Sequence, residues 1–407
     1  MDRTNGHHAA AAEPTLRVVD IINLSSSANT LLKERVLAMR ARGIDNRILC
    51  MDGPYVAPLR QAGIPVETVP LPRGLNPIRL AASLASIVFY LRRHRVDVVH
   101  THCSVPGVVG RVGAWLAGVP VIVHTVHGFH FHDRTPWLKR APSVAIERLC
   151  GLLTDTLLTQ NRTDLEQANR YGIGPRDRRR RIGNGIDVGR FRPILRLPRP
   201  DQPVVLTCVA RLEPVKNHPL LFEAARILAG RGERFRLRLI GDGPLKADYQ
   251  QLCRRLEIDS LVEFLGYRDD IPQLLLETDI AVLTSLKEGI PRAVLEAMAM
   301  GIPVVATRVM GTSEAVRHGE TGLTVALGDV DGLAASLSLL MRDSSLRKAM
   351  GARAREVAVQ EFDERPIVES LRKVYRARWL AQRINTSVPL EAEGLGDGLR
   401  ATSRADG

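Results

Sequence analysis

Two glutamates in the second half of the chain are placed where they could hold a ligand. Glu288 and Glu296 lie eight residues apart in the segment SLKEGIPRAVLEAMAMGIPVVAT, residues 285–307. The neighbours of Glu296 are almost all apolar, and burying an unpaired carboxylate among such residues costs free energy. We therefore expect its side chain either to face water or to bind hydroxyl groups. Glu288 alone would be an ordinary loop acid, and it is the pair that favours a binding site.

The stretch between the two glutamates is typical of an anion-binding helix start. Pro291 suits the first position of a helix, and we expect the helix to cover residues 292–300. Gly289 has no side chain to keep a ligand away from the backbone. The amides of Gly289 and Ile290 would then lie at the helix N-terminus, where backbone N–H groups attract negative charge.

A second group of residues could neutralise phosphates. Arg211 and Lys216 stand five residues apart in VARLEPVKNH, directly after an expected strand. Two cations at a strand end, opposite a helix N-terminus, could clamp a pyrophosphate. An Arg and a Lys in a loop are, however, more often simply solvated. The turn IGDGPL adds Gly241 and Gly243 after another strand, and alone it could be no more than a chain reversal.

These residues need a scaffold that brings strand ends together, and the hydrophobic pattern predicts one. Short apolar runs alternate with amphipathic helical segments, as in βαβ units with parallel sheets. In the first half we expect strands over residues 16–24, 47–51, 66–69, 96–100, 119–126 and 155–159. In the second half we expect strands over residues 204–210, 235–240, 261–265, 279–284, 303–306 and 322–325. Ligands of such sheets bind beyond the carboxyl ends of the strands.

The chain divides near its middle. Four prolines between residues 192 and 203 indicate a linker. We predict an α/β protein with two doubly wound domains, over residues 15–191 and 204–365. A helix over 366–385 is expected to return to the first domain, and the tails, 1–14 and 386–407, are expected to be disordered.

Composition and charge narrow the function classes. The five cysteines form no C-x-x-C pair, which indicates a reducing compartment without a disulfide framework or a thiolate zinc site. No apolar run reaches the length of about 20 residues that a membrane span needs. Residues 1–195 hold 27 Lys and Arg against 15 Asp and Glu, whereas residues 196–407 hold 30 against 29. The basic first half would attract phosphates or anionic lipid headgroups, or it is a solubilising surface.

The motifs together resemble the family-4 retaining glycosyltransferases, which have the GT-B architecture of two Rossmann-like domains facing across a cleft. The resemblance covers residues 16–385. It rests on A-R-L…K-N, on G-D-G and on E-G-I-P…E-A-M-A-x-G-I-P-V-V-A. The segments IPVETVPLPRGLNP, DVVHTHCSVPGVVGR and GVPVIVHTVHGFHFH look like bacterial capsule and exopolysaccharide members. The Gly-Gly turn that many members carry after the first strand is replaced here by LSSSANTLLKE, residues 24–34.

The resemblance implies an N-terminal acceptor domain, a C-terminal nucleotide-sugar domain and a role for each motif residue. Arg211 and Lys216 would neutralise the donor diphosphate, and the Gly241–Gly243 turn would belong to the same donor site. Glu288 would contact hydroxyls of the donor sugar, Gly289 and Ile290 would offer amides, and Glu296 would hold the ribose. The backbone around Arg268 would read the base. His127, from the N-terminal domain, would sit against the sugar, and we take His127 and Glu288 as the catalytic candidates.

Four histidines crowd the segment from residue 124 to residue 132. His124, His127, His130 and His132, next to Asp133, could be read as a metal site. No thiolate or carboxylate pair joins them, and His124 and His127 straddle a strand end. We therefore expect no metal and no cofactor, with the nucleotide-sugar, expected to be a UDP-sugar, as substrate.

Several alternatives remain open at this point. A sugar-nucleotide epimerase would share the architecture, and a non-catalytic nucleotide-sugar-binding protein would keep the same motifs. An RNA-binding protein would explain the charge, but no motif supports nucleic acid. We expect a cytoplasmic enzyme with a glycan, lipid-linked or small-molecule acceptor. The run RDRRRR, residues 176–181, with Arg92, Arg93 and Arg95, would either dock an anionic membrane or be solvated.

Overall fold

The computed structural model describes residues 15–71, 76–129, 131, 135–194 and 202–387. The first sheet consists of β1 (Arg17–Ile21), β2 (Asp45–Cys50), β3 (Val66–Thr68), β4 (Val98–His102), β5 (Val121–Val126), β6 (Thr156–Thr159) and β7 (Arg179–Arg181). The second consists of β8 (Val204–Val209), β9 (Phe235–Ile240), β10 (Val262–Gly266), β11 (Ile280–Leu283), β12 (Val304–Thr307) and β13 (Gly322–Val325). The predicted first tail, residues 388–407 of the predicted second tail and residues 195–201 of the predicted linker lie outside the described residues. Residues 386 and 387, predicted as tail, belong to the last helix instead.

Helices connect the strands of both sheets. Those of the first half are α1 (Ser25–Ser27), α2 (Lys33–Arg40), α3 (Val56–Gln61), α4 (Pro77–His94), α5 (Ser104–Ala117), α6 (Trp137–Leu152) and α7 (Arg162–Tyr171). Those of the second half are α8 (His218–Gly230), α9 (Lys246–Arg255), α10 (Ile271–Leu275), α11 (Arg292–Ala299), α12 (Met310–Ala315), α13 (Val330–Arg342), α14 (Ser344–Glu361) and α15 (Glu364–Ser387). None of the described helices combines the length and the apolar character that crossing a bilayer requires.

Each sheet reverses its strand order at one internal point. The orders are β3-β2-β1-β4-β5-β6-β7 and β10-β9-β8-β11-β12-β13, and all paired strands run parallel. The order therefore reverses between β1 and β4 in the first sheet and between β8 and β11 in the second. Loops diverge at such a switch point, and the crevice at the carboxyl ends of the strands binds ligands. The predicted fold of two doubly wound Rossmann-like domains is confirmed.

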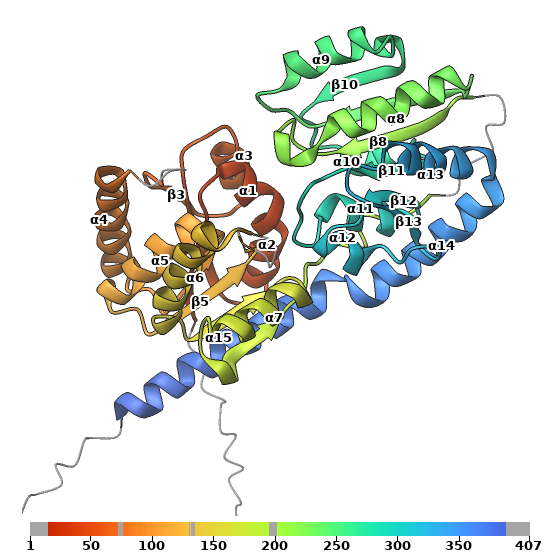
Figure 1. The fold of residues 1–407 in the computed structure, drawn as a ribbon. Helices are drawn as coiled ribbons and strands as arrows, with labels where there is room; N and C mark the ends of the chain where they lie inside the picture. Colours follow the sequence, from red (N-terminus) through yellow and green to blue (C-terminus); the bar gives the residue numbers. More distant parts are fainter. Residues whose placement is uncertain (1–14, 72–75, 130, 132–134, 195–201, 388–407) are drawn as a thin grey trace, which may run out of the picture.

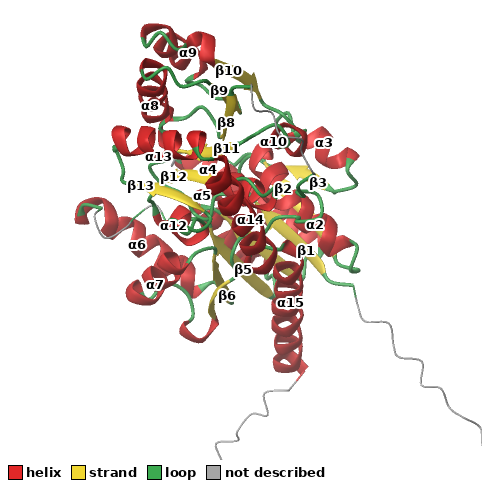
Figure 2. Cartoon of the chain, turned by 90° about the vertical axis from the view of Figure 1, so that its right-hand side faces the viewer, coloured by secondary structure: helices red, strands yellow, loops and turns green. Residues whose placement is uncertain are grey.

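The last helix ties the end of the chain to the first domain. Figure 1 shows α14 and α15 running from the C-terminal domain back along the N-terminal one, and Figure 2 shows α15 at the base of the first sheet. Leu371, Tyr375 and Trp379 of α15 are buried in one cluster with Val18, Val98 and other strand residues. Backbone hydrogen bonds join Ile186 to Phe362 and Glu364, so the two segments that cross between the domains lie side by side.

The structure differs from the predicted elements in three places. Strand β4 ends at His102 instead of residue 100, which places His102 in the sheet. Part of the arginine run is an edge strand, β7, which pairs with β6. The segment 24–34 replaces the Gly-Gly turn, and the expected helix begins at Leu31; in the structure Ser25–Ser27 are already helical and a π-helical turn over Ala28–Leu32 leads into α2. Leu32 and Ala28 are fully buried there, and their packing against the sheet supports the helical turns.

Candidate active site

The carboxyl edges of the two sheets meet across the domain boundary. Gly289, which follows β11, lies so close to the first domain that a Cβ atom there would be 3.0 Å from the backbone oxygen of His127 and 3.0 Å from Oε1 of Gln160. Lys287 donates a hydrogen bond to the carbonyl of Phe129. The loop after β5 and the loop after β11 therefore face each other, and only glycine fits at residue 289 without a shift of its neighbours.

Lys216 and Glu288 are brought together by the switch point of the second sheet. Lys216 follows β8 and Glu288 follows β11, the neighbouring strand. Nζ of Lys216 lies 2.5 Å from Oε1 of Glu288, and the hydroxyl of Ser285 donates to the same oxygen at 2.6 Å. The hydroxyl of Thr284 donates to the carbonyls of Lys216 and Asn217, which fastens the two loops to each other. The predicted cation and the predicted carboxylate thus form one half-buried ion pair.

Two backbone amides next to this ion pair have no partner. Within the described part of the chain, the N–H groups of Gly289 and Ile290 donate no hydrogen bond. Helix α11 begins at Arg292, with Pro291 as the residue before its first turn, so both amides precede the helix. Buried backbone N–H groups are rarely left unpaired, and such a pair beside a lysine is suited to binding an anion.

Arg211 lies on the same loop as Lys216 but makes a separate contact. Its guanidinium is 2.7 Å from Oε1 of Glu213 and is 43% exposed. Gly241 and Gly243 support this loop from behind: a Cβ atom at Gly241 would be 2.1 Å from the carbonyl oxygen of Ala210, and one at Gly243 would be 2.4 Å from that of Leu212. In this structure the two glycines therefore allow two backbone segments to pack closely and hold the Arg211 loop in place.

Glu296 is neither solvated nor unpaired. Its side chain is 12% exposed and lies 3.4 Å from the guanidinium of Arg292, one turn earlier on α11. Burial raises the pKa of Glu296, and Arg292 and Arg190 partly offset this effect. The carboxylate therefore sits in a costly position with incomplete compensation, which is suited to a group that gains hydrogen bonds from a ligand.

The loop after β10 reaches the first domain beside Arg268. The Arg268 guanidinium forms a bidentate ion pair with Asp270, at 2.6 and 2.7 Å, and points to solvent. The neighbouring Tyr267 accepts a hydrogen bond from Asn29 at 3.0 Å, and its ring lies 4.8 Å from that of Tyr55. Two aromatic rings from different domains thus flank the loop that was predicted to read a base.

His127 is the residue that the first domain contributes. It directly follows β5, and its Nε2 lies 3.1 Å from Nδ1 of His102. Burial, together with the nearby Arg35 guanidinium, lowers the pKa of His127 to about 4. The imidazole is therefore neutral at pH 7 and acts through hydrogen bonds rather than as a cation.

The other predicted histidines do not join His127. His124 is buried and its Nδ1 is 2.8 Å from the hydroxyl of Thr101. His130, His132 and Asp133 lie outside the described residues. His124 and His127 therefore belong to different hydrogen-bonded groups.

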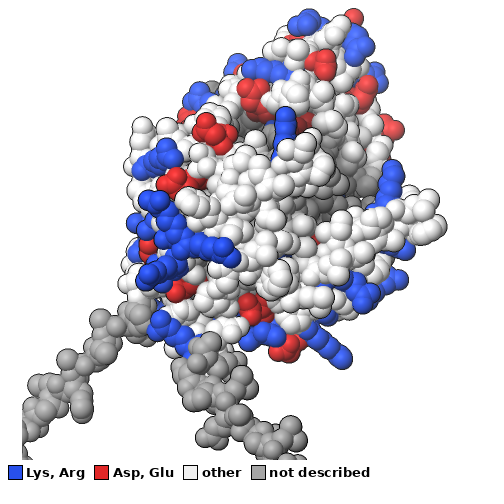
Figure 3. Space-filling model, turned by 90° about the vertical axis from the view of Figure 1, so that its left-hand side faces the viewer, with Lys and Arg blue, Asp and Glu red and all other residues white. Residues whose placement is uncertain are grey.

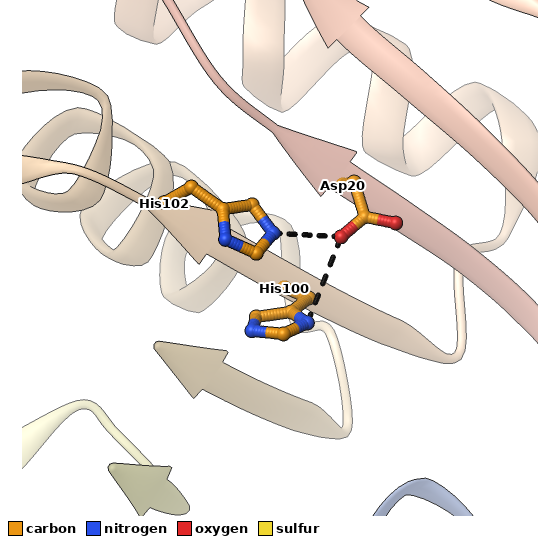
Figure 4. Close-up of side chains that lie close together, drawn as sticks. All are labelled: Asp20, His100 and His102. Carbon is orange, nitrogen blue, oxygen red and sulfur yellow. Dashed lines mark hydrogen bonds and ion pairs between the residues drawn. The ribbon is translucent and has the colours of Figure 1, made fainter. Parts of the chain in front are cut away.

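One other cluster among the described residues has the composition of a metal site. Asp20, His100 and His102 each offer one ligand atom, and these atoms lie within 4.8 Å of one another (Figure 4). The Arg35 guanidinium, however, is 2.6 Å from Oδ1 of Asp20. Both ring nitrogens of His100 are already engaged, with Tyr375 and with Thr125, at 2.6 Å each. A guanidinium at the carboxylate opposes a second cation, so these residues do not fit a metal ion.

Sequence reasoning missed several residues at this site. Lys287, Gln160 and Asn184 were not predicted, yet Asn184 donates to the carbonyl of Ile290 at 2.8 Å and so bridges the domains. Gln160 follows β6 as His127 follows β5, and this position after a strand is the signal that could have found it. Burial lowers the pKa of Lys287.

Part of the arginine run, residues 176–181, makes hydrogen bonds and ion pairs within the protein. Arg179 donates to the carbonyl of Gly174, and Arg178 lies near Asp155 and Asp177. Arg181 is 3.8 Å from Glu314 of the second domain. Only part of the predicted basic patch therefore remains open at the surface.

Each half of the chain matches the model of a known protein family. The model of the family described as glycosyl transferases group 1 matches residues 195–357. The model of the glycosyl transferase 4-like domain matches residues 28–185.

Individual relatives agree with these matches. The chain is 31% identical over 317 residues to an Escherichia coli UDP-Gal:alpha-D-GlcNAc-diphosphoundecaprenol alpha-1,3-galactosyltransferase, covering 74% of this chain and 81% of that protein. It is 32% identical over 301 residues to the putative glycosyltransferase EpsD of Bacillus subtilis, covering 70% and 77%. The crystal structure of Anabaena HepE in complex with UDP and glucose has the same fold, with a TM-score of 0.75 and 22% identity, and covers 89% of this chain and 100% of that one.

Proposed function

This chain belongs to the glycosyl transferases group 1 family, and from this premise we propose that it moves a hexose-type sugar from a UDP-sugar to a lipid-linked glycan acceptor, with retention of the anomeric configuration. The choice of UDP is supported by the E. coli relative, named for UDP-Gal, and by the HepE complex with UDP and glucose. The choice of acceptor is supported by the diphosphoundecaprenol-linked acceptor in the name of the same relative.

One observation carries the donor site: the Lys216–Glu288 ion pair lies beside the unpartnered amides of Gly289 and Ile290. A nucleoside diphosphate presents negative oxygens that both the ammonium group and the amides would bind. Each charge-assisted hydrogen bond contributes about 1.5–3 kcal/mol. Arg211, on the same loop, would exchange its contact with Glu213 for the diphosphate.

The proposed reaction needs stabilisation mainly at the leaving group. The bond between the anomeric carbon and the diphosphate oxygen breaks, and its electron pair stays on UDP. The acceptor hydroxyl oxygen forms the new bond, and its proton passes to the departing phosphate. Lys216 and the two amides would stabilise the charge that grows on UDP, because preorganised donors in a site of this kind lower the barrier. In this proposal no metal ion takes part.

The remaining predicted residues are assigned to the rest of the donor. Glu288 would bind sugar hydroxyls once the diphosphate draws Lys216 away, and Glu296 would bind the ribose hydroxyls. The backbone around Arg268, flanked by Tyr267 and Tyr55, would hold the base. Gly241 and Gly243 would act indirectly, by holding the Arg211 loop.

A transfer assay tests this function. The protein is incubated with UDP-glucose, UDP-galactose and their N-acetyl forms, together with a synthetic polyprenyl-diphosphate sugar. We expect transfer from one of them, an α-linked product by NMR, and activity in the presence of EDTA. A β-linked product would contradict retention, and loss of activity with EDTA would contradict the metal-independent mechanism. Interconversion of donor sugars without an acceptor would instead indicate an epimerase.

We also propose that the N-terminal domain contacts an anionic membrane, at the cytoplasmic face where a lipid-linked acceptor would be reached. The face in question is formed by α4, α5 and α6. It exposes large apolar side chains: Ile78, Phe89, Trp115, Leu116, Trp137, Leu138, Ile146, Leu149 and Leu152. The one carboxylate in these three helices, Glu147, is buried and paired with Arg111 at 2.8 Å.

Basic residues accompany this apolar face. Arg92, Arg93, Lys139 and Arg148 are exposed on the same helices. Figure 3 views the molecule from the side on which α4 lies in Figure 1, and much of that face is uncharged, with Lys and Arg and some Asp and Glu gathered toward its edges. Helices that expose apolar and basic side chains and no acid are suited to the interface of a negatively charged bilayer.

Vesicle binding tests this contact. We expect the protein to sediment with vesicles of phosphatidylglycerol but not with vesicles of phosphatidylcholine, and to be released by salt. Leu149→Glu, on α6, should abolish sedimentation, whereas Leu339→Glu, at a comparably exposed position of the C-terminal domain, should not. Equal binding of both variants would place the contact elsewhere.

A further inference from the structure

A chain of hydrogen bonds runs from a buried carboxylate to His127, and only its last member belongs to the site described so far. Asp20 lies on β1, His102 ends β4 and His127 follows β5, and these strands are neighbours around the switch point of the first sheet. Oδ1 of Asp20 is 2.7 Å from Nε2 of His102, and Nδ1 of His102 is 3.1 Å from Nε2 of His127. Figure 4 shows the His102 ring turned toward the carboxylate.

The carboxylate at the start of this chain is held rigidly. Asp20 is fully buried, and Nη2 of Arg35 is 2.6 Å from its Oδ1. The side-chain amide of Asn46 donates to Oδ2 at 2.7 Å. A buried carboxylate with a guanidinium and two further donors around it is fully satisfied. Its position and charge are therefore set by the domain itself and do not depend on a ligand.

The charge of Asp20 determines where the protons of both imidazoles lie. A carboxylate only accepts hydrogen bonds, so Nε2 of His102 must carry a proton. Burial lowers the pKa of His102 well below its ordinary value, so the ring is neutral and its Nδ1 is an acceptor. Nε2 of His127 must then donate to it, and Nδ1 of the neutral His127 keeps its lone pair. The Arg35 guanidinium also lies 3.0 Å from Nε2 of His102, but both groups donate to Asp20 and not to each other.

We propose that Asp20 and His102 are positioning residues that hold His127 in its Nε2–H form, so that Nδ1 accepts a hydrogen bond from a hydroxyl of the donor sugar. This inference rests on the proposed function and on the placement of the donor sugar against His127 that the resemblance implies. The Gln160 side chain also hydrogen-bonds to His127 in the free protein, and in the proposed complex a sugar hydroxyl takes its place.

The direction of this hydrogen bond matters for the chemical step. As the bond to the diphosphate breaks, positive charge develops on the sugar ring, as in other glycosyl transfers. A nitrogen lone pair that faces the sugar stabilises that charge, whereas an N–H group or an imidazolium would oppose it. The hydrogen-bonded chain Asp20–His102–His127, called the relay below, therefore acts on the transition state more than on the bound donor.

Asp20→Asn made together with Arg35→Leu reverses this hydrogen-bond chain, because Arg35 alone would hold an amide oxygen at the Oδ1 position. In the double variant Asn46 holds the amide oxygen at the Oδ2 position. The amide nitrogen then donates to Nε2 of His102, which moves the His102 proton to Nδ1 and the His127 proton to its own Nδ1. We expect kcat to fall about 10- to 100-fold, the range typical of residues that orient a histidine through a hydrogen bond, with the donor KM changed less than about twofold. In protein labelled with 15N-histidine, long-range 1H–15N NMR should show His127 protonated on Nε2 in the wild type and on Nδ1 in the variant.

Asn46→Ala is the matched control. It removes the hydrogen bond to Oδ2 of Asp20 but leaves Oδ1 on His102, so the tautomer of His127 and kcat should stay as in the wild type. A wild-type His127 protonated on Nδ1 would overturn the proposal, and so would an unchanged kcat in the double variant. If the double variant does not fold, the wild-type tautomer alone decides. If the wild type transfers no sugar, the proposed function fails while the tautomer measurement still stands.

Discussion

The two switch points of this molecule differ in how far their charged groups are buried. At the first sheet, between β1 and β4, the polar groups are buried and satisfy one another: Asp20, Arg35 and His102 leave no contact open to solvent. At the second sheet, between β8 and β11, the charges lie on loops and are partly exposed, as in the Lys216–Glu288 pair. Ion pairs on loops can be exchanged for a ligand at low cost, whereas buried ones cannot. The first edge is suited to orienting a group and the second to binding a charged one.

The largest expected effect is a loss of unfolding free energy when the buried ion pair at the first switch point is broken. Arg35→Leu leaves the Asp20 carboxylate buried without its cation, and breaking such a pair costs about 3–5 kcal/mol of unfolding free energy. Urea denaturation measures this loss. The control, Arg226→Ala, removes an exposed pair with Glu223 and should give no measurable change. An Arg35→Leu protein as stable as the wild type would mean that the first edge is no more rigid than the second.

The next effect is a loss of donor affinity when a charge at the second switch point is removed. Lys216→Ala removes one charge-assisted contact to the diphosphate and should weaken UDP-sugar binding about 10- to 100-fold, as measured by calorimetry. Lys348→Ala changes an exposed lysine on α14 by the same chemistry and should bind the donor like the wild type. Equal affinities in the two variants would remove Lys216 from the donor site.

The smallest expected effect concerns Glu296. Because burial raises its pKa, the ionised carboxylate destabilises the folded protein, and stability falls as pH rises through the range between the ordinary and the raised value. Glu296→Gln should therefore raise the melting temperature at pH 7 by about 1–3 °C and lose this advantage at acid pH. At the same time it should weaken donor binding about tenfold, the effect of about 1.4 kcal/mol. A variant that is more stable and binds equally well would show that Glu296 has no contact with the ribose.

The strands of both sheets could be predicted from the sequence because each buried parallel strand is a short apolar run between turn residues. Eleven of the thirteen strands were expected within two residues or so of their bounds, as in β9 (Phe235–Ile240). Strand β7 was missed because three consecutive arginines carry no apolar signal, and the strand exists only because β6 offers its edge. The helical turns before Leu31 were missed because Ser and Asn favour turns locally, whereas burial of Ala28 and Leu32 decides their structure.

The site was predictable only where a motif is local. Glu288, Gly289 and Lys216 stand near the strand ends that position them, and the structure brings them together. The relay was not predictable in this way, because Asp20, His102 and His127 come from three separate strands. Its signal, three consecutive polar residues in the fully buried strand VVHTH, indicates buried polar groups but not their partners.

The most direct test of this account is a thermal-shift panel of UDP, GDP, ADP and dTDP and their glucose conjugates, on the wild type and on Arg211→Ala and Lys216→Ala. We predict stabilisation by UDP and UDP-sugars alone, greatly reduced in both variants, because the donor diphosphate would bind the loops after β8 and β11. Stabilisation by another base would contradict the assigned donor. Stabilisation by UDP that survives both substitutions would contradict the central claim, that the exchangeable charges at the second switch point bind the donor.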